Sequence, residues 1–146
     1  MTFESINPEE LGPPKGWTNG MLAPAGGRVL FVAGQDAATP GGEVETDDFV
    51  EQFDIVLGKM MTVVTHAGGD ATSVGRITLF VTDLDAYRAE RKKIGEIYRA
   101  RMGRHFPAMA LVEVSRLVDP RAKIEIEATA VIAESVGPDT RLAPEG

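Results

Sequence analysis

The 146-residue sequence contains no cysteine, only two histidines and no long apolar run. The missing cysteine excludes disulfides, thiol nucleophiles and thiolate metal ligands. No segment approaches the roughly 18 apolar residues that a membrane-spanning helix needs. The first residues are acidic and polar, without the basic start and apolar core of a secretory signal. We therefore expect a cytoplasmic protein with no membrane partner.

The charge balance argues against a polyanionic partner. The net charge is −7, which disfavours binding to nucleic-acid backbones and anionic lipid. Seven of the fifteen basic residues nevertheless lie between Arg88 and Arg104. A helix there could present a basic face to nucleic acid, but a solvated outer face is the simpler interpretation. We expect no nucleic-acid partner.

The order of apolar segments predicts one α+β domain. The first 27 residues are rich in proline and glycine and are expected to form an irregular arm with one extended piece at 17–21. Thr46 or Asp47 is expected to cap a helix that runs to about Ala67, and Asp83 a second helix that runs to about Met102. Further strands are expected at 28–33, 76–82, 108–117 and 123–133. This β-β-α-β-α-β-β order predicts a single sheet with two helices on one face, followed by a loose tail from residue 134.

The last two strands give the sheet a second face of mixed character. Ile124, Ile126 and Ala128 alternate with Glu125, Glu127 and Thr129. In the preceding strand, Ala108 and every second residue after it alternate with Met109, Leu111 and Glu113. If the Ala108 set packs under the helices, Met109 and Leu111 share the other face with carboxylates. Such a face suits a subunit interface that also lines a pocket, so an oligomer is expected.

Few residues have the spacing of a catalytic or metal site. His66 and His105 lack a partner at metal-ligand spacing, so no metal is expected. No serine lies in a nucleophile elbow and no glycine-rich loop has the P-loop form. Glu113, Glu125 and Glu127 remain as candidate general acids or bases, because partial enclosure raises a carboxyl pKa. The alternative is that they only stabilise an interface by pairing with basic residues, Arg116 and Lys123 among them.

Five segments, in order, form a recognisable set of motifs: GWTNG at 16–20, VAGQ at 32–35, LFVTDL at 79–84, FPAMALVEVSRL at 106–117 and KIEIEA at 123–128. Together they resemble the Rid/YjgF family of reactive-intermediate deaminases, whose members are also labelled endoribonuclease L-PSP. The similarity spans about residues 16–133.

This resemblance implies a chorismate-mutase-like fold assembled as a homotrimer with clefts between subunits. Residues 1–146 would form one domain, with a core at 16–133 and arms at 1–15 and 134–146. Active members of the family hydrolyse enamines and imines to ketoacids and ammonia, without a metal or organic cofactor. The expected activity is therefore that of a 2-iminobutanoate/2-iminopropanoate-deaminase-like hydrolase with an altered substrate range.

The resemblance also implies roles for individual residues. The arginine that grips the substrate carboxylate in the family's P-A-R-S motif is replaced by Met109, which has no charge and no fixed donor. Losing that partner costs on the order of 2–5 kcal/mol in binding. Glu125 matches the glutamate that directs water at the C=N carbon. Gly34 and Gln35 match the pocket-lining S-G-Q turn, and Trp17 replaces a tyrosine.

Trp17, Met109 and Leu111 together predict a cleft more apolar than in members that have the arginine. The sequence thus favours a hydrolase acting on a small, relatively apolar enamine or imine. The alternative is a non-catalytic trimer that binds a small molecule or a protein partner. Arg76 or Arg116 could restore the missing charge. Ribonuclease activity is disfavoured, because no histidine pair is available for acid–base cleavage.

Overall fold

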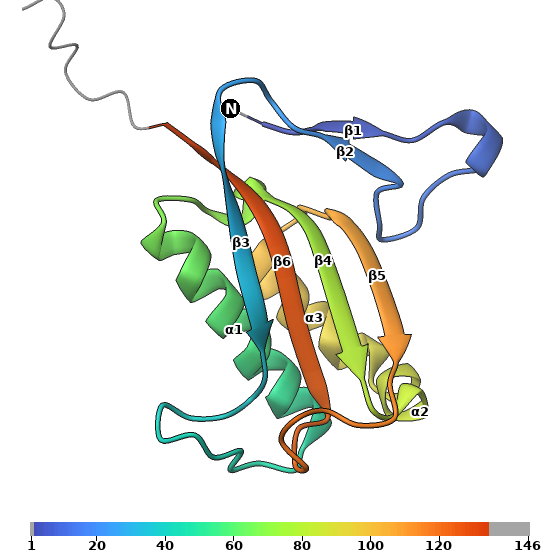
Figure 1. Cartoon of the computed structure of the whole chain (residues 1–146). Coiled ribbons are helices and arrows are strands. Elements are labelled where there is room, and N and C mark those ends of the chain that lie inside the picture. The colour runs from blue at the N-terminus through green and yellow to red at the C-terminus, as the bar shows by residue number, and fades with distance from the viewer. Residues whose placement is uncertain (1, 135–146) are drawn as a thin grey trace, which may run out of the picture.

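The apolar segments form a four-stranded sheet in the order β3-β6-β4-β5 (Figure 1). The computed structural model describes residues 2–134. The strands are β3 (Gly27–Gln35), β4 (Val74–Val81), β5 (Ala108–Glu113) and β6 (Ile124–Ala133). Neighbouring strands are antiparallel except β4 and β5, which run parallel. The predicted α+β class is confirmed.

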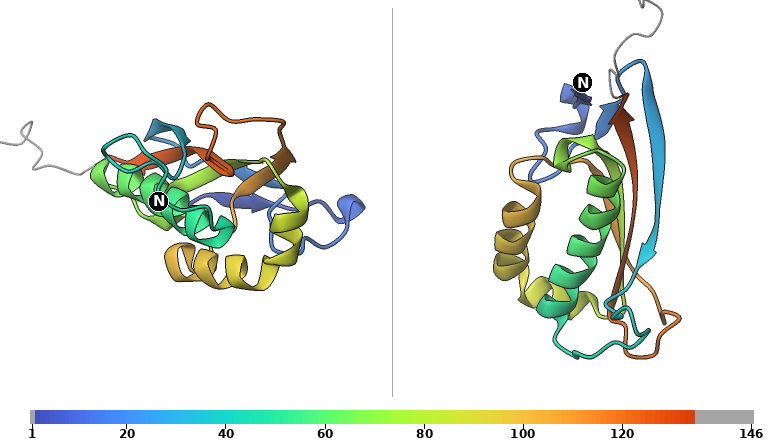
Figure 2. Two further views of the ribbon diagram at one scale, coloured as in Figure 1. Left: turned by 90° about the horizontal axis from the view of Figure 1, so that it is seen from below. Right: turned by 90° about the vertical axis from the view of Figure 1, so that its left-hand side faces the viewer.

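The helices cover one face of this sheet, as predicted (Figure 2). α1 (Phe49–His66) begins one or two residues later than expected, because its cap is Asp48, whose side chain accepts a hydrogen bond from the Glu51 amide. The second predicted helix is broken at Glu90 into α2 (Leu84–Ala89) and α3 (Arg91–Met102). Gly103 ends α3 with a φ of +62°, a conformation that glycine adopts without strain.

The core lies between α1 and the helix-facing side of the sheet. The alternation predicted for β6 is confirmed, because Ile124, Ile126 and Ala128 are buried. The assignment considered for β5 is reversed. Met109 pairs with the buried Ile77 of β4, so it faces the helices, while Val112 is 43% exposed on the other face. Alternation alone could not decide between the two sides of β5.

The N-terminal arm is more ordered than the sequence suggests. β1 (Glu4–Ile6), which was not predicted, pairs with β2 (Gly20–Leu22) in a separate two-stranded sheet, and the short η1 (Glu9–Leu11) lies between them. The extended piece expected at 17–21 is therefore shifted to β2 and lies outside the main sheet, which corrects the single-sheet prediction. A Cβ on Gly75 of β4 would lie 2.7 Å from the Phe3 ring, so this glycine accommodates the arm.

The segments at either end of the main sheet differ from the prediction in length. β5 ends at Glu113 rather than at 117, and the Glu113 carboxylate accepts a hydrogen bond from the Leu84 amide at the start of α2. A short η2 (Ala71–Ser73) joins α1 to β4. No helix within residues 2–134 is both long and apolar enough to cross a bilayer. The loose tail expected from residue 134 lies, from residue 135 onward, outside the described residues.

Candidate functional site

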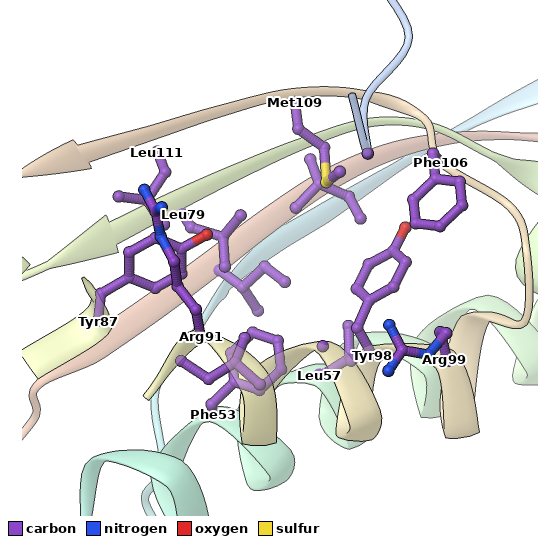
Figure 3. A pocket seen from close by; sticks show the side chains of 15 residues that line it. Phe53, Leu57, Leu79, Tyr87, Arg91, Tyr98, Arg99, Phe106, Met109 and Leu111 are labelled. Atoms are coloured by element: carbon purple, nitrogen blue, oxygen red, sulfur yellow. The ribbon is translucent and has the colours of Figure 1, made fainter. Parts of the chain in front are cut away.

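A cavity of about 360 Å³ lies between α3 and the helix-facing side of β5, at the edge of the sheet (Figure 3). This volume is in the range of small-molecule pockets, which run from about 300 to 1,000 Å³. Its floor and walls are mainly apolar. They include Phe53, Leu57, Ile77, Leu79, Ile94, Phe106, Met109, Leu111 and Ile126.

Two predicted site residues lie in this cavity. Met109 and Leu111 both project from β5 toward α3, because residues two apart on a strand point to the same side (Figure 3). Neither side chain can hold an anion. The β5 wall therefore presents only apolar surface to a ligand, in keeping with the apolar character expected from the sequence.

An aromatic pair closes one end of the cavity. The rings of Tyr98 and Phe106 stack with centroids 5.5 Å apart and an interplanar angle of 13°. The Tyr98 hydroxyl donates to the His105 carbonyl at 2.6 Å. Burial raises the pKa of the Tyr98 phenol above its ordinary value, so the phenol stays neutral and keeps this donor role.

The N-terminal arm reaches the same end. The Thr18 hydroxyl donates to the Phe106 carbonyl at 2.5 Å, and Gly16 contributes to the cavity wall. Trp17 lies between them in the chain but is 45% exposed and is not among the residues that line the cavity. The aromatic wall predicted for Trp17 is therefore supplied within this chain by Tyr98 and Phe106.

The α3 wall, opposite β5, carries two arginines that are exposed, as predicted for the basic residues of this segment, and that also border the cavity. Arg91 and Arg99 of α3 line the cavity, with Gly95 between them. The three residues are four apart and so lie along one side of the helix. This spacing, together with the apolar Ile94 on the same side of the helix, is the signal in the sequence that could have identified them.

The predicted glutamate and glycine lie together on the other face of the sheet. Glu125 and Met109 both pair with β4: Glu125 of β6 lies beside Phe80, and Met109 of β5 lies beside Ile77. Adjacent residues of a strand point to opposite faces, and an odd spacing separates Phe80 from Ile77. A Cβ on Gly34 would clash with the Glu125 carboxylate, so a side chain at this position would displace that carboxylate. Within one chain, then, the predicted site residues fall into two groups on opposite faces.

The remaining polar candidates lie elsewhere. The Gln35 amide donates to the Ala33 carbonyl at 3.0 Å, at the end of β3 beside Gly34. Arg76 and Glu127 border a small hollow on the outer face. Arg116 lines an open hollow beside the loop between β5 and β6. Neither Arg76 nor Arg116 lines the cavity at Met109.

The structure offers little that resembles a metal site. The His105 ring contacts the Val74 carbonyl at 2.6 Å, and the His66 ring contacts the Thr62 carbonyl at 2.9 Å. Across residues 2–134, no group of three or more histidine, aspartate or glutamate side chains is placed to hold a metal ion.

A sequence profile of the family described as Endoribonuclease L-PSP matches residues 11–132. The chain belongs to this family. The DfrA protein of Myxococcus xanthus is 34% identical over 130 residues, which cover 85% of this chain and 88% of that protein. The human 2-iminobutanoate/2-iminopropanoate deaminase is 29% identical over 106 residues, 71% of this chain and 73% of the human protein.

A solved member of the family has the same fold. The crystal structure of YyfB from Yersinia pestis, described as a protein of unknown function of the conserved Rid family, superposes with a TM-score of 0.78 and 31% identity. The match covers 90% of this chain and all of that one. The Rid/YjgF resemblance and its chorismate-mutase-like fold are thereby confirmed.

Proposed function

We propose that this protein hydrolyses the C–N bond of a small, relatively apolar enamine or imine, releasing a carbonyl compound and ammonia. The observation that carries the proposal is the apolar cavity between β5 and α3 in a member of a family whose relatives include imine deaminases. The cavity is large enough for a metabolite with a branched or aromatic side chain. No cofactor is invoked, because water is the only co-reactant that the reaction needs.

The proposed reaction needs a group that directs water. In our proposal Glu125 accepts a proton from water as its oxygen attacks the C=N carbon, and the nitrogen leaves as ammonia once it has been protonated. Gly34 leaves the space in which the Glu125 carboxylate lies. Glu125 and the cavity occupy opposite faces of one chain, so a homotrimer that sets one subunit's outer face against its neighbour's cavity would bring them together.

Met109 sets the substrate range in this proposal. A small 2-imino acid has little apolar surface and depends on its carboxylate for binding, and a methionine offers that carboxylate nothing. A larger apolar side chain gains about 25 cal/mol for each Å² that it buries in the cavity. We therefore expect bulky apolar imines to be preferred to those derived from alanine.

The test generates imines in place with an amino-acid oxidase and traps them with semicarbazide. We expect the wild-type protein to lower the semicarbazone yield from leucine and phenylalanine more than the yield from alanine. Glu125→Gln should abolish the effect, while Glu127→Gln, on the same strand and face, should retain it. Met109→Arg should shift the preference toward alanine. An unchanged yield with every amino acid would overturn the proposal.

A second function is favoured by one observation. The β5 wall lacks an anion anchor, and Glu125 lies on the other face of the chain. A non-catalytic trimer that binds a small molecule or a protein partner needs neither group. In that case ligands would bind the cavity while the semicarbazone yield stayed at the value without protein.

A further inference from the structure

One wall of the otherwise apolar cavity is positively charged. Its lining includes the guanidinium groups of Arg91 and Arg99 and no carboxylate. The chain as a whole has a net charge of −7, so this concentration of positive charge is local. Charge of one sign in a pocket with low-dielectric walls attracts a ligand of the opposite sign.

Both arginines are available to a ligand. Within residues 2–134 neither forms an ion pair, whereas Arg101 on the same helix is bonded to Asp54 at 2.7 Å. Figure 3 shows Arg99 beside Tyr98 at one end of the cavity, and Arg91 rising toward Leu111 at the other. Their separation of eight positions corresponds to about 12 Å along the helix.

Gly95, midway between the arginines, makes room for the Arg99 side chain. A glycine inside a helix lowers stability by roughly 0.5–1 kcal/mol relative to alanine, so a close contact at this position would account for its presence. A Cβ there would lie 3.3 Å from Nη1 of Arg99, which shows that the Arg99 side chain is turned back over Gly95. The missing Cβ at Gly95 thus lets the Arg99 guanidinium lie back along the helix, at the wall of the cavity.

We propose that α3 supplies the anion anchor that position 109 lacks, and that the ligand is an organic carboxylate with a bulky apolar body. The carboxylate is bound by Arg99 at one end of the cavity, while Arg91 adds positive charge at the other end. The apolar body extends along Met109 and Leu111. The inference rests on the proposed function only in using the same cavity as the ligand site.

Binding of stable ketones tests this inference without requiring turnover. Calorimetric titration of the wild-type protein would compare phenylpyruvate with phenylacetone, which has a methyl group in place of the carboxylate, and with pyruvate, which lacks the apolar body. We expect phenylpyruvate to bind on the order of tenfold or more tighter than either, because phenylacetone lacks the charge-assisted hydrogen bonds of the carboxylate and pyruvate lacks the apolar contacts of the ring.

Substitutions on α3 test whether this helix binds the carboxylate. Arg99→Gln should weaken phenylpyruvate binding by on the order of tenfold and Arg91→Gln by less, with phenylacetone unaffected by either change. Lys92→Gln removes the same charge from the same helix outside the cavity and should leave binding unchanged. Gly95→Ala should weaken binding severalfold without lowering the melting temperature, because the added methyl group displaces the Arg99 guanidinium and alanine improves helix propensity.

Two outcomes would overturn the inference. One is equal affinity for phenylpyruvate and phenylacetone in the wild-type protein. The other is phenylpyruvate binding that survives Arg99→Gln. Either result leaves the proposed hydrolysis standing if the semicarbazone yield still falls. Conversely, carboxylate binding that depends on Arg99 supports the inference even if no imine is hydrolysed.

Discussion

Gln52 of α1 has no exposed surface, yet its side-chain amide is fully bonded. Its amide nitrogen donates to the Thr46 carbonyl at 2.8 Å and to the Arg121 carbonyl at 3.0 Å. Its oxygen accepts the Lys123 amide at 2.8 Å. This one side chain joins the segment before α1 to the connection between β5 and β6.

Replacing Gln52 should therefore destabilise the fold strongly. Gln52→Met keeps the length of the side chain but leaves the Lys123 amide and two carbonyls unpaired. We expect a loss of about 2–4 kcal/mol in the free energy of unfolding, measured by urea denaturation. Glu96→Met, an exposed substitution on α3, should change the free energy by less than about 0.5 kcal/mol. Comparable effects for the two variants would show that the bonds of Gln52 contribute little.

Residue roles could be predicted only where the sequence shows the pattern that produces them. The buried face of α1 follows from helical spacing, and Gln52 falls on it, one turn after Phe49. Its three partners come from loops that no spacing rule brings together. Arg91 and Arg99 are exposed, as predicted, but the sequence did not show that they also border a cavity, because a basic residue beside an apolar stripe can lie on either side of the boundary of a helix face.

At the scale of elements, glycines determine how closely neighbours approach. α1 contacts α3 near Gly58, where a Cβ would lie 2.9 Å from the Arg101 guanidinium. Gly69, just after α1, differs, because its Cβ would lie 2.6 Å from the buried Ile132 side chain and 2.7 Å from the Ser73 hydroxyl. The Arg101 guanidinium is the end of a flexible side chain and can move aside, whereas Ile132 is part of the core and cannot.

The same substitution should consequently have opposite effects at these two positions. Gly58→Ala displaces Arg101 and weakens an exposed ion pair worth less than about 1 kcal/mol, but gains about 0.5–1 kcal/mol of helix propensity. We expect it to be neutral or slightly stabilising. Gly69→Ala should destabilise by about 1–3 kcal/mol, because the core must shift. Urea denaturation of both variants checks this, and equal effects would contradict it.

Element types were predictable from periodicity, but their orientation was not. The two faces of β5 both contain apolar side chains, so the alternation there is equally consistent with either face turned toward the helices. Pairing with β4 decides the matter by placing Met109 beside Ile77. The same pairing places Met109 and Glu125 on opposite faces of the sheet. It could not be predicted, because it depends on contacts between strands that are distant in the sequence.

At the scale of the whole molecule, the sheet face opposite the helices is left uncovered by the described chain. Val29 is 58% exposed and Phe31 is 79% exposed on β3, with Val112 at the far side of the sheet. Exposed apolar side chains gathered on one face are typical of an interface between subunits. This face carries Glu125 as well, so assembly and the proposed chemistry would depend on the same surface.

Charge placed on that face should disrupt the proposed trimer. Phe31→Glu is expected to yield monomers in sedimentation velocity experiments, because a carboxylate buried at the interface would be unpaired. Val118→Glu changes a loop residue that is 99% exposed and should leave the assembly intact. A wild-type protein that sediments as a monomer would contradict the proposal directly.

The N-terminal arm carries a natural fluorescent probe, Trp17. Trp17 is the only tryptophan in the chain, and it adjoins Thr18, whose hydroxyl ties the arm to Phe106 at the end of the cavity. Its emission therefore reports a single place, with no second indole to obscure it. The protein has in effect its own fluorescent label beside the cavity, and the signal would follow ligand entry and arm displacement without any chemical modification.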